Sequence, residues 1–289
     1  MKIEAAFLAA CAEELSAPKP GNVHVHAAGH GMSVADFARS AAVSAPLLCA
    51  PGAPLGRRIR DAAAATRDAV GQNTNLGILL LCGPLAMAAE CRVADLRQAV
   101  VRVIAASDLA DAEDVFAAIR IARPGGLGTA ARHDVNAPAA VRLGEAMAEA
   151  ASRDSVARQW SHGFADVFGG GMDAYAEGRA RWPSLGGNHP AWAAVMAYLH
   201  FLAGFPDSHV QRKHGAAVAA GLQSESRRFA GEFSACTDPR TLLPGLLAWD
   251  AVLKADGINP GTSADLTVAT AFAWHLQNGA PAEWLALPR

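Results

Sequence analysis

Apolar residues recur along most of the chain at the three- and four-residue spacing of helices, and the alternating pattern of strands is nearly absent. Alanine, whose side chain loses no rotamer freedom in a helix, dominates these segments. Proline and glycine separate them. The pattern therefore predicts an all-α protein, with helices over Ile3–Leu15, Val34–Leu47, Leu55–Val70, Leu76–Cys91, Val93–Ala106, Asp111–Ala122, Ala137–Arg153, Val156–Val167, Trp192–Gly204 and Ala264–Leu276.

No linker, repeat or low-complexity tract divides residues 1–289, so we expect a single compact multi-helix domain. Ser33 is placed to cap the second helix, and Asp36 completes a capping box three residues later. The stretch Gly169–Asn188 is rich in glycine and is predicted to be a mobile surface loop.

Charge and composition exclude several classes of function. Lys and Arg total 25 against 27 Asp and Glu, and no basic run occurs, so nucleic-acid binding is not expected. Leu76–Ala89 and Ala191–Phe205 are uncharged but shorter than the ~20 residues of a membrane span. Five scattered cysteines form no metal or disulfide pattern, and the start of the chain lacks a signal-peptide pattern. We therefore expect a cytoplasmic protein without membrane partners.

Polar residues gather at four places where helices begin or end. The first cluster is Ala17–His26 with the following Gly29–Ser33. Its rigid turn from Lys19 to Asn22 can present an ammonium and an amide to phosphate, or simply connect two helices. His24 and His26, nearby, point to opposite sides of an extended segment, so this pair is not expected to bind a metal. The second is the run from Gln72 to Asn75 before a very apolar helix, where an anion-binding helix start is expected, because capping needs only one polar residue.

The other two clusters contain carboxylates. Asp207 is followed by Ser208, histidines and cations, and this segment can bind metal and phosphate or form a charged turn. Thr262 or Ser263 can cap the last predicted helix and place Asp265 in its first turn. There Asp265 either only stabilises the helix dipole or holds Mg²⁺. No phosphate-binding P-loop, dinucleotide fingerprint or serine-hydrolase motif is present.

Taken together and in this order, the four clusters resemble the motifs of the triphosphoribosyl-dephospho-CoA synthase family, over nearly the whole chain. Lys19-Pro20-Gly21-Asn22-Val23 resembles the family's K-P-G-x-V, and Gly29-His30-Gly31-Met32 its G-A-H-x-D-M region. The remaining matches are Asn73-Thr74-Asn75-Leu76-Gly77 with N-T-H-K-G, Asp207-Ser208-His209-Val210 with D-T-N-V, and Pro260-Gly261-Thr262-Ser263-Ala264-Asp265-Leu266 with P-G-G-S-A-D-L.

The resemblance implies an all-α fold and a transferase reaction. In that reaction the 2′-hydroxyl of dephospho-CoA attacks the ribose C1′ of ATP and displaces adenine, with Mg²⁺ on the phosphates. As hypotheses, we assign roles in this reaction to residues of this chain. The expected phosphate- and nucleotide-binding residues are Lys19, Asn22, Asn73, Thr74, Asn75, Arg123 and Lys213. Asp207 and Asp265 are expected to bind Mg²⁺, and Asp265 or Asp134 is expected to be the catalytic base. His30 and His214 are the expected proton donors.

One departure from the family keeps other functions open. The family's His-Lys pair is replaced by Asn75-Leu76, as in a divergent branch from methanogens and methylotrophs that is associated with one-carbon cofactor synthesis. A related enzyme of methanopterin- or furan-type cofactor synthesis is therefore one alternative, and a non-catalytic nucleotide-binding helical protein is another. An Ala/Leu-rich helix face could also pair two copies, so a homodimer is a further hypothesis.

Overall fold

The computed structural model describes residues 3–91, 94–182 and 189–280. Within these ranges the chain forms fourteen α-helices and no strand, which confirms the predicted all-α class. The helices are α1 (Ile3–Ser16), α2 (Val34–Leu48), α3 (Leu55–Val70), α4 (Leu76–Glu90), α5 (Leu96–Ala106), α6 (Leu109–Ala122), α7 (Leu143–Ala150), α8 (Ser155–Ser161), α9 (Met172–Arg181), α10 (His189–Gly204), α11 (Ser208–His214), α12 (Ala216–Ala235), α13 (Leu243–Ala255) and α14 (Gly261–Asn278).

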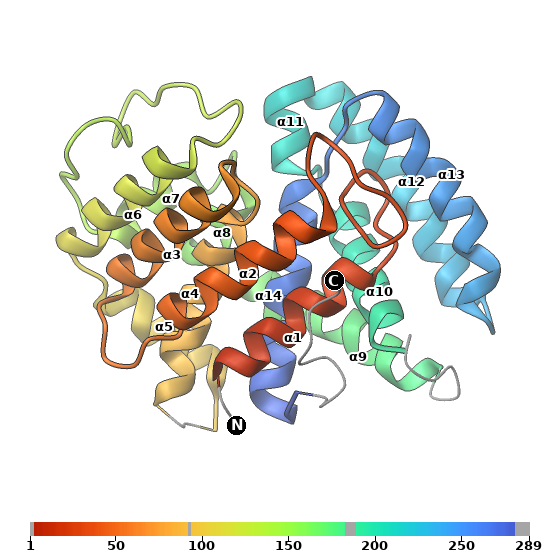
Figure 1. Cartoon of the computed structure of the whole chain (residues 1–289), viewed down its shortest axis with the longest axis horizontal. Helices are drawn as coiled ribbons and strands as arrows, with labels where there is room; N and C mark the ends of the chain where they lie inside the picture. The colour runs from red at the N-terminus through yellow and green to blue at the C-terminus, as the bar shows by residue number, and fades with distance from the viewer. Residues whose placement is uncertain (1–2, 92–93, 183–188, 281–289) are drawn as a thin grey trace.

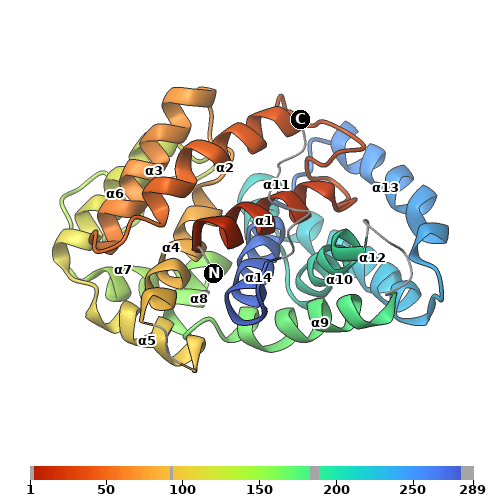
Figure 2. The ribbon, with the colours of Figure 1, turned by 60° about the horizontal axis from the view of Figure 1, so that its bottom comes forward.

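The last helix, α14, is the centre of the molecule. It packs against α1, α4 and α10, and Figures 1 and 2 show it surrounded by the other helices. Twelve of its residues are buried, most of them small or apolar. The hydroxyls of Thr267 and Thr270 donate to carbonyls four residues earlier, so these polar side chains are buried with their hydrogen bonds satisfied.

The remaining helices form two groups. Figure 1 shows α2 to α8 on one side of α1 and α14, and α9, α12 and α13 on the other. Helix α11 lies where the groups meet, close to the start of α14. Residues near these two helix starts can therefore face both groups.

The glycine-rich stretch Gly169–Asn188 is not a surface loop over most of its length, and that prediction was wrong. Val167–Gly171 forms a π-helical turn that leads into α9. A Cβ on Gly170 would lie 2.4 Å from Nε2 of His200, and one on Gly171 would lie 2.5 Å from Cζ of Phe201. These glycines mark close packing against α10. Residues 183–188 lie outside the described part of the chain.

Several predicted helix ends differ from the structure. The helix expected over Ala137–Arg153 is only α7, and the one expected over Val156–Val167 ends at Ser161, before Gly163 and Phe164 take positive φ angles. Helix α5 begins at Leu96 with Asp95 as its cap, and residues 92–93 are not described. The helices α9, α11, α12 and α13 were not predicted.

The predicted caps gave mixed results. Ser33 caps α2, and its capping box with Asp36 is confirmed. Thr262 and Ser263 do not cap α14, because that helix already starts at Gly261.

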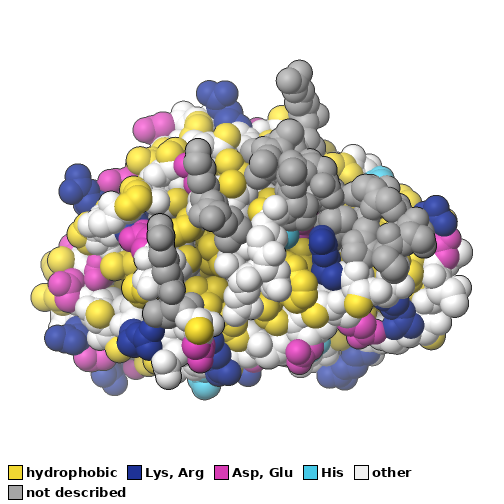
Figure 3. All heavy atoms as spheres, turned by 90° about the horizontal axis from the view of Figure 1, so that it is seen from below, with side chains coloured by type: hydrophobic (Ala, Val, Ile, Leu, Met, Phe, Trp, Pro, Cys, Tyr) yellow, Lys and Arg dark blue, Asp and Glu magenta, His cyan; other side chains and the backbone are white. Residues whose placement is uncertain are grey.

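No helix in the described ranges combines the length and hydropathy needed to cross a membrane. Figure 3 shows hydrophobic side chains at the surface of the face seen from below, beside residues whose placement is uncertain. The large hydrophobic residues that are exposed belong to separate elements: Val25, Val101, Leu109, Leu127 and Val252. They do not define one dimer face, and the homodimer stays a prediction.

Candidate active site

A pocket of about 390 Å³ opens where the two helix groups meet. Its walls are α4, α6, α7 and α8 on one side, the starts of α11 and α14 on the other, and residues 124–135 of the loop that follows α6. Pockets that bind small molecules commonly measure about 300–1,000 Å³. This pocket therefore has the size of a ligand site.

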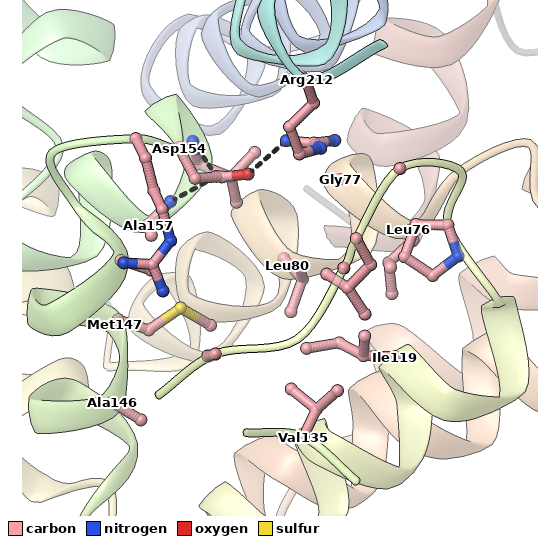
Figure 4. Close-up of a pocket in the computed structure, with 18 of the residues that line it drawn as sticks. Leu76, Gly77, Leu80, Ile119, Val135, Ala146, Met147, Asp154, Ala157 and Arg212 are labelled. Atoms are coloured by element: carbon pink, nitrogen blue, oxygen red, sulfur yellow. Dashed lines mark hydrogen bonds and ion pairs between the residues drawn. The ribbon is translucent and has the colours of Figure 1, made fainter. Parts of the chain in front are cut away.

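The pocket has an apolar part and a polar part, as Figure 4 shows. The apolar part is lined by the side chains of Leu80, Ile119, Val135, Ala146 and Met147. A flat, weakly solvated ring system fits such a surface, because its burial removes apolar area from water.

The polar part holds a fixed guanidinium. Asp154 caps α8 by accepting from the N–H groups of Val156 and Ala157, and its other oxygen accepts from Nη1 of Arg212 at 2.8 Å. The side chains of Arg212 and Asp154 are 27% and 31% exposed, so the pair is partly shielded from water. Asp154 is the only acceptor that Arg212 has among the described residues, which leaves further N–H donors for an anionic ligand.

Asp265 also lines the pocket, and its carboxyl packs directly against Gly77. A Cβ on Gly77, in the first turn of α4, would lie 2.0 Å from Oδ2 of Asp265. Within the described ranges the carboxyl has no hydrogen-bond partner. Burial raises the pKa of Asp265 well above its usual value, and the nearby carboxylates Glu14, Asp207 and Asp154 add to the shift. These influences favour the protonated form of the carboxyl.

Asp207 joins the starts of α11 and α14. One of its oxygens accepts from the N–H groups of His209 and Val210, and the other accepts from the N–H and Oγ of Ser263, at 2.8–3.0 Å. The side chain of Asp207 is buried. We call this arrangement the Asp207 clasp. It fixes α11 and α14 relative to each other at the pocket.

His209 reaches the pocket from the first turn of α11. A Cβ on Gly261 would lie 2.7 Å from its Nδ1, so the ring packs tightly against the start of α14. Burial, with help from Arg212 and Lys213, lowers the pKa of His209 to about 4. The ring is therefore neutral at pH 7, with one nitrogen able to accept a proton.

A sequence model of the CitG family, described as ATP:dephospho-CoA triphosphoribosyl transferase, matches residues 1–283. The chain belongs to the CitG family. The fold also matches the solved structure of a protein from Archaeoglobus fulgidus, provisionally described as a triphosphoribosyl-dephospho-CoA synthase. That match has a TM-score of 0.61 at 23% sequence identity, and covers 83% of this chain and 98% of the other. No curated protein matches the sequence.

Membership of the CitG family makes the chain a transferase whose substrates are ATP and dephospho-CoA. The two alternatives raised by the sequence, a one-carbon cofactor enzyme and a non-catalytic binding protein, are not favoured by these matches.

The family resemblance singled out Lys19, but this side chain does not line the pocket. Its Nζ donates to the carbonyls of Glu14 and Val23 and pairs with Oε1 of Glu14 at 2.9 Å, and the side chain is fully buried. Burial lowers the pKa of Lys19 and raises that of Glu14, and their pairing opposes both shifts. In this arrangement Lys19 holds the turn between α1 and α2.

The other residues of this first cluster also lie outside the pocket. The side chain of Asn22 donates to Oδ1 of Asn259, and the Gly21 N–H donates to Oδ1 of Asp250 in α13. Nε2 of His30 lies 2.8 Å from the carbonyl of Gly21. These contacts connect the turn to α13 and to the segment before α14.

In the second cluster only Asn73 reaches the pocket, and its Oδ1 accepts from the N–H of Leu76 at the start of α4. Thr74 and Asn75 turn toward α2 instead. The hydroxyls of Thr74 and Ser40 are 2.5 Å apart, and Nδ2 of Asn75 donates to Oγ of Ser44. Both side chains are buried there.

The remaining predicted residues lie at or beyond the rim. Asp134 lines the pocket, but its carboxylate accepts hydrogen bonds from Ala130 and Asn136 in its own loop, which lower its pKa. Arg123 ends α6 and lines a separate hollow with Arg67 and Arg120. Lys213 and His214 do not line the pocket. The side chain of Lys213 lies beside Gly125 and Gly126, and Nε2 of His214 is 3.2 Å from the carbonyl of Gly257.

Asp207 and Asp265 do not fit together as a magnesium site. Both oxygens of Asp207 are already occupied by four donated hydrogen bonds, and a cation would have to displace these donors. Within residues 3–91, 94–182 and 189–280, no group of three or more His, Cys, Asp or Glu side chains could hold a metal ion.

The sequence placed His209 and Arg212 in a cluster that can bind metal and phosphate but gave neither a role of its own, and it did not single out Asp154; all three line the pocket. His209 and Arg212 are three residues apart and so share one face of α11, and both side chains line the pocket. The helix itself was not predicted, so this spacing carried no signal. Asp154 precedes α8 as a typical cap, and only the fold shows its contact with Arg212.

Proposed function

We propose that this pocket is the site of triphosphoribosyl transfer from ATP to dephospho-CoA. The observation that supports it most is the combination of a guanidinium fixed by Asp154, an unpaired carboxyl on Asp265 and an apolar part in one pocket. ATP has the matching sequence of parts: an anionic triphosphate, a ribose and a flat base. In our proposal the triphosphate binds at Arg212, the base lies in the apolar part, and C1′ of the ribose faces Asp265.

Each residue has a task that its surroundings allow. Arg212 neutralises phosphate charge with the N–H groups that Asp154 does not use. Leu80, Ile119 and Met147 exclude water from the base. His209 accepts the proton of the incoming hydroxyl, because its ring is neutral. Mg²⁺ enters with ATP as part of the substrate, bound to the phosphate oxygens, and needs no site of its own on the chain.

The reaction is tested by incubating the protein with ATP, Mg²⁺ and dephospho-CoA and separating the products by chromatography. We expect free adenine, and a product heavier than dephospho-CoA by one triphosphoribosyl group. Formation of ADP or AMP without adenine would contradict the proposal.

The place of the triphosphate is tested by Arg212→Gln. We expect the KM for ATP to rise about tenfold or more, because a charged hydrogen bond to phosphate is lost. Arg240→Gln is the matched control, since Arg240 also pairs with an aspartate, Asp238, but lies away from the pocket. Equal KM values for both variants would remove Arg212 from the site.

We further propose that the enzyme works in the cytoplasm. All five cysteines are unpaired, and three of them are buried, which suits a reducing compartment.

A further inference from the structure

Among the carboxyl groups that line the described pocket, that of Asp265 has neither a hydrogen-bond partner nor an ion-pair partner. Every other carboxylate that lines the described pocket has a partner: Asp134 in its own loop, Asp154 with Arg212, and Glu149 with Arg132. Asp265 is partly shielded from water, and a carboxyl withdrawn from water without a hydrogen-bond partner destabilises the fold. Such a group persists where a ligand or a reaction uses it.

The neighbours of Asp265 determine which form of the carboxyl is present. Glu14 from α1, Asp207 before α11 and Asp154 before α8 all oppose a further negative charge, and the guanidinium of Arg212 favours one. Burial acts in the same direction as the three carboxylates. The raised pKa favours the protonated form of Asp265, which can donate a proton, over the ionised form that a general base needs.

The position of the carboxyl points to the acceptor of this proton. Oδ2 lies against Gly77, and the neighbouring Leu76 and Leu80 of α4 line the pocket. In the proposed function a purine occupies the apolar part, so a proton held on Asp265 faces the bond between the ribose and the base.

We propose that Asp265 is the general acid of the transfer and donates its proton to a ring nitrogen of the departing adenine. This inference rests on the proposed function.

The step balances. The C1′–N9 bond breaks, its electron pair goes to the base, and the base leaves as neutral adenine with the proton from Asp265. The 2′-hydroxyl oxygen of dephospho-CoA bonds to C1′ and gives its proton to His209. One proton is released and one is taken up in each turnover, so exchange with solvent restores both groups.

The Asp207 clasp relates the two groups geometrically. His209 lies two residues after Asp207, and Asp265 lies two residues after Ser263, the other partner in the clasp. The group that donates a proton to adenine and the group that accepts one from dephospho-CoA are thus both positioned by the buried carboxylate of Asp207. Their pKa values are shifted in opposite directions, which is the pattern of an acid and a base in one site.

The experiment compares two leaving groups in Asp265→Asn and in the wild type. The first is adenine, from ATP. The second is 4-nitrophenolate, from 4-nitrophenyl riboside 5′-triphosphate, which leaves as a stable anion and needs no proton. With dephospho-CoA as acceptor, we expect Asp265→Asn to lose about a thousandfold in kcat with ATP, within the range of general acid catalysis. With the nitrophenyl substrate it should stay within about tenfold of the wild type.

An equal loss with both substrates would overturn the proposal, because a nucleophile, a metal ligand or a purely structural residue would affect both. Asp95→Asn, at the exposed cap of α5, is the control and should leave both rates unchanged. A wild type that releases no adenine from ATP would instead refute the proposed function itself.

The pH dependence gives a second measurement, which uses ATP and dephospho-CoA and needs no nitrophenyl substrate. In the wild type we expect kcat to fall as the pH rises through the raised pKa of Asp265 and the carboxyl loses its proton. The residual activity of Asp265→Asn should lack this decrease. A wild-type kcat that stays constant up to high pH would overturn the proposal.

Discussion

At the scale of single residues, the contact between Gly77 and Asp265 sets the shape of the reacting part of the pocket. The glycine matters here for its missing Cβ, since any Cβ would meet the carboxyl at 2.0 Å. The carboxyl can lie against the start of α4 only while position 77 has no side chain.

Gly77→Ala should therefore displace Asp265. We expect kcat to fall about 100-fold, the loss that a shift of about 1 Å in a reacting group can cause. Gly221→Ala is the matched control, because a Cβ added there, on the exposed side of α12, would meet no atom within 4 Å. That variant should gain about 1 kcal/mol in the free energy of unfolding and keep its kcat. Similar kinetics for both variants would contradict the role of Gly77.

Lys19 offers a second test at this scale, between a structural and a phosphate-binding role. Lys19→Ala leaves Glu14 buried without its cation, so we expect the free energy of unfolding to fall by about 3–5 kcal/mol in a denaturant titration. The double variant Lys19→Met with Glu14→Gln removes both charges and should recover most of this stability together with the activity. If the double variant is stable but no longer binds ATP, Lys19 binds phosphate after all.

At the scale of elements, the Asp207 clasp decides how α11 and α14 meet. Asp207→Asn keeps one acceptor oxygen but places an amide opposite the donors of Ser263. We expect a loss of about 1–3 kcal/mol in the free energy of unfolding and a lower kcat, because both helices carry reacting groups.

Asp95→Asn again provides the comparison for this variant. Asp95 caps α5 with one hydrogen bond from the N–H of Gln98, and asparagine caps equally well. A Tm and a kcat for Asp207→Asn that match those of Asp95→Asn would show that the clasp is not needed.

The helical pattern predicted most elements of the first half of the chain, because each depends on local spacing. The polar clusters located Asn73 and Asp265, and the roles assigned after the family resemblance added Asp134; all three line the pocket. The sequence could not show that Asp207 is bound by Ser263, 56 residues away, since that contact exists only in the folded chain. For the same reason it could not separate Lys19, which pairs with Glu14, from a lysine free to bind phosphate.

At the scale of the whole molecule, the loop after α6 is the longest non-helical segment that lines the described pocket. It is tied to α6 at two points. Arg120 donates to the carbonyl of Val135, and the N–H of Ala139 donates to Glu113 at 2.8 Å. Between α6 and these two contacts, Gly125, Gly126 and Gly128 of the loop line the pocket.

Ligand binding should therefore slow amide hydrogen exchange in this loop. With saturating ATP and Mg²⁺ we expect peptides that cover residues 124–142 to exchange more slowly, because the loop covers the bound nucleotide. Peptides from α12, which contributes no residue to the pocket, should not change. Unchanged exchange in the loop would place the nucleotide elsewhere.

The division of the pocket between the two halves of the chain has a practical consequence. The apolar part comes from α4, α6, the loop after α6 and α7, all before residue 150, whereas Arg212, His209 and Asp265 come from the last third. Designers who want to install a ribosyl donor with a bulkier heterocycle could trim Met147 or Ile119 while the catalytic framework stays untouched. The residues that select the leaving base and the residues that catalyse its departure thus come from different parts of the chain.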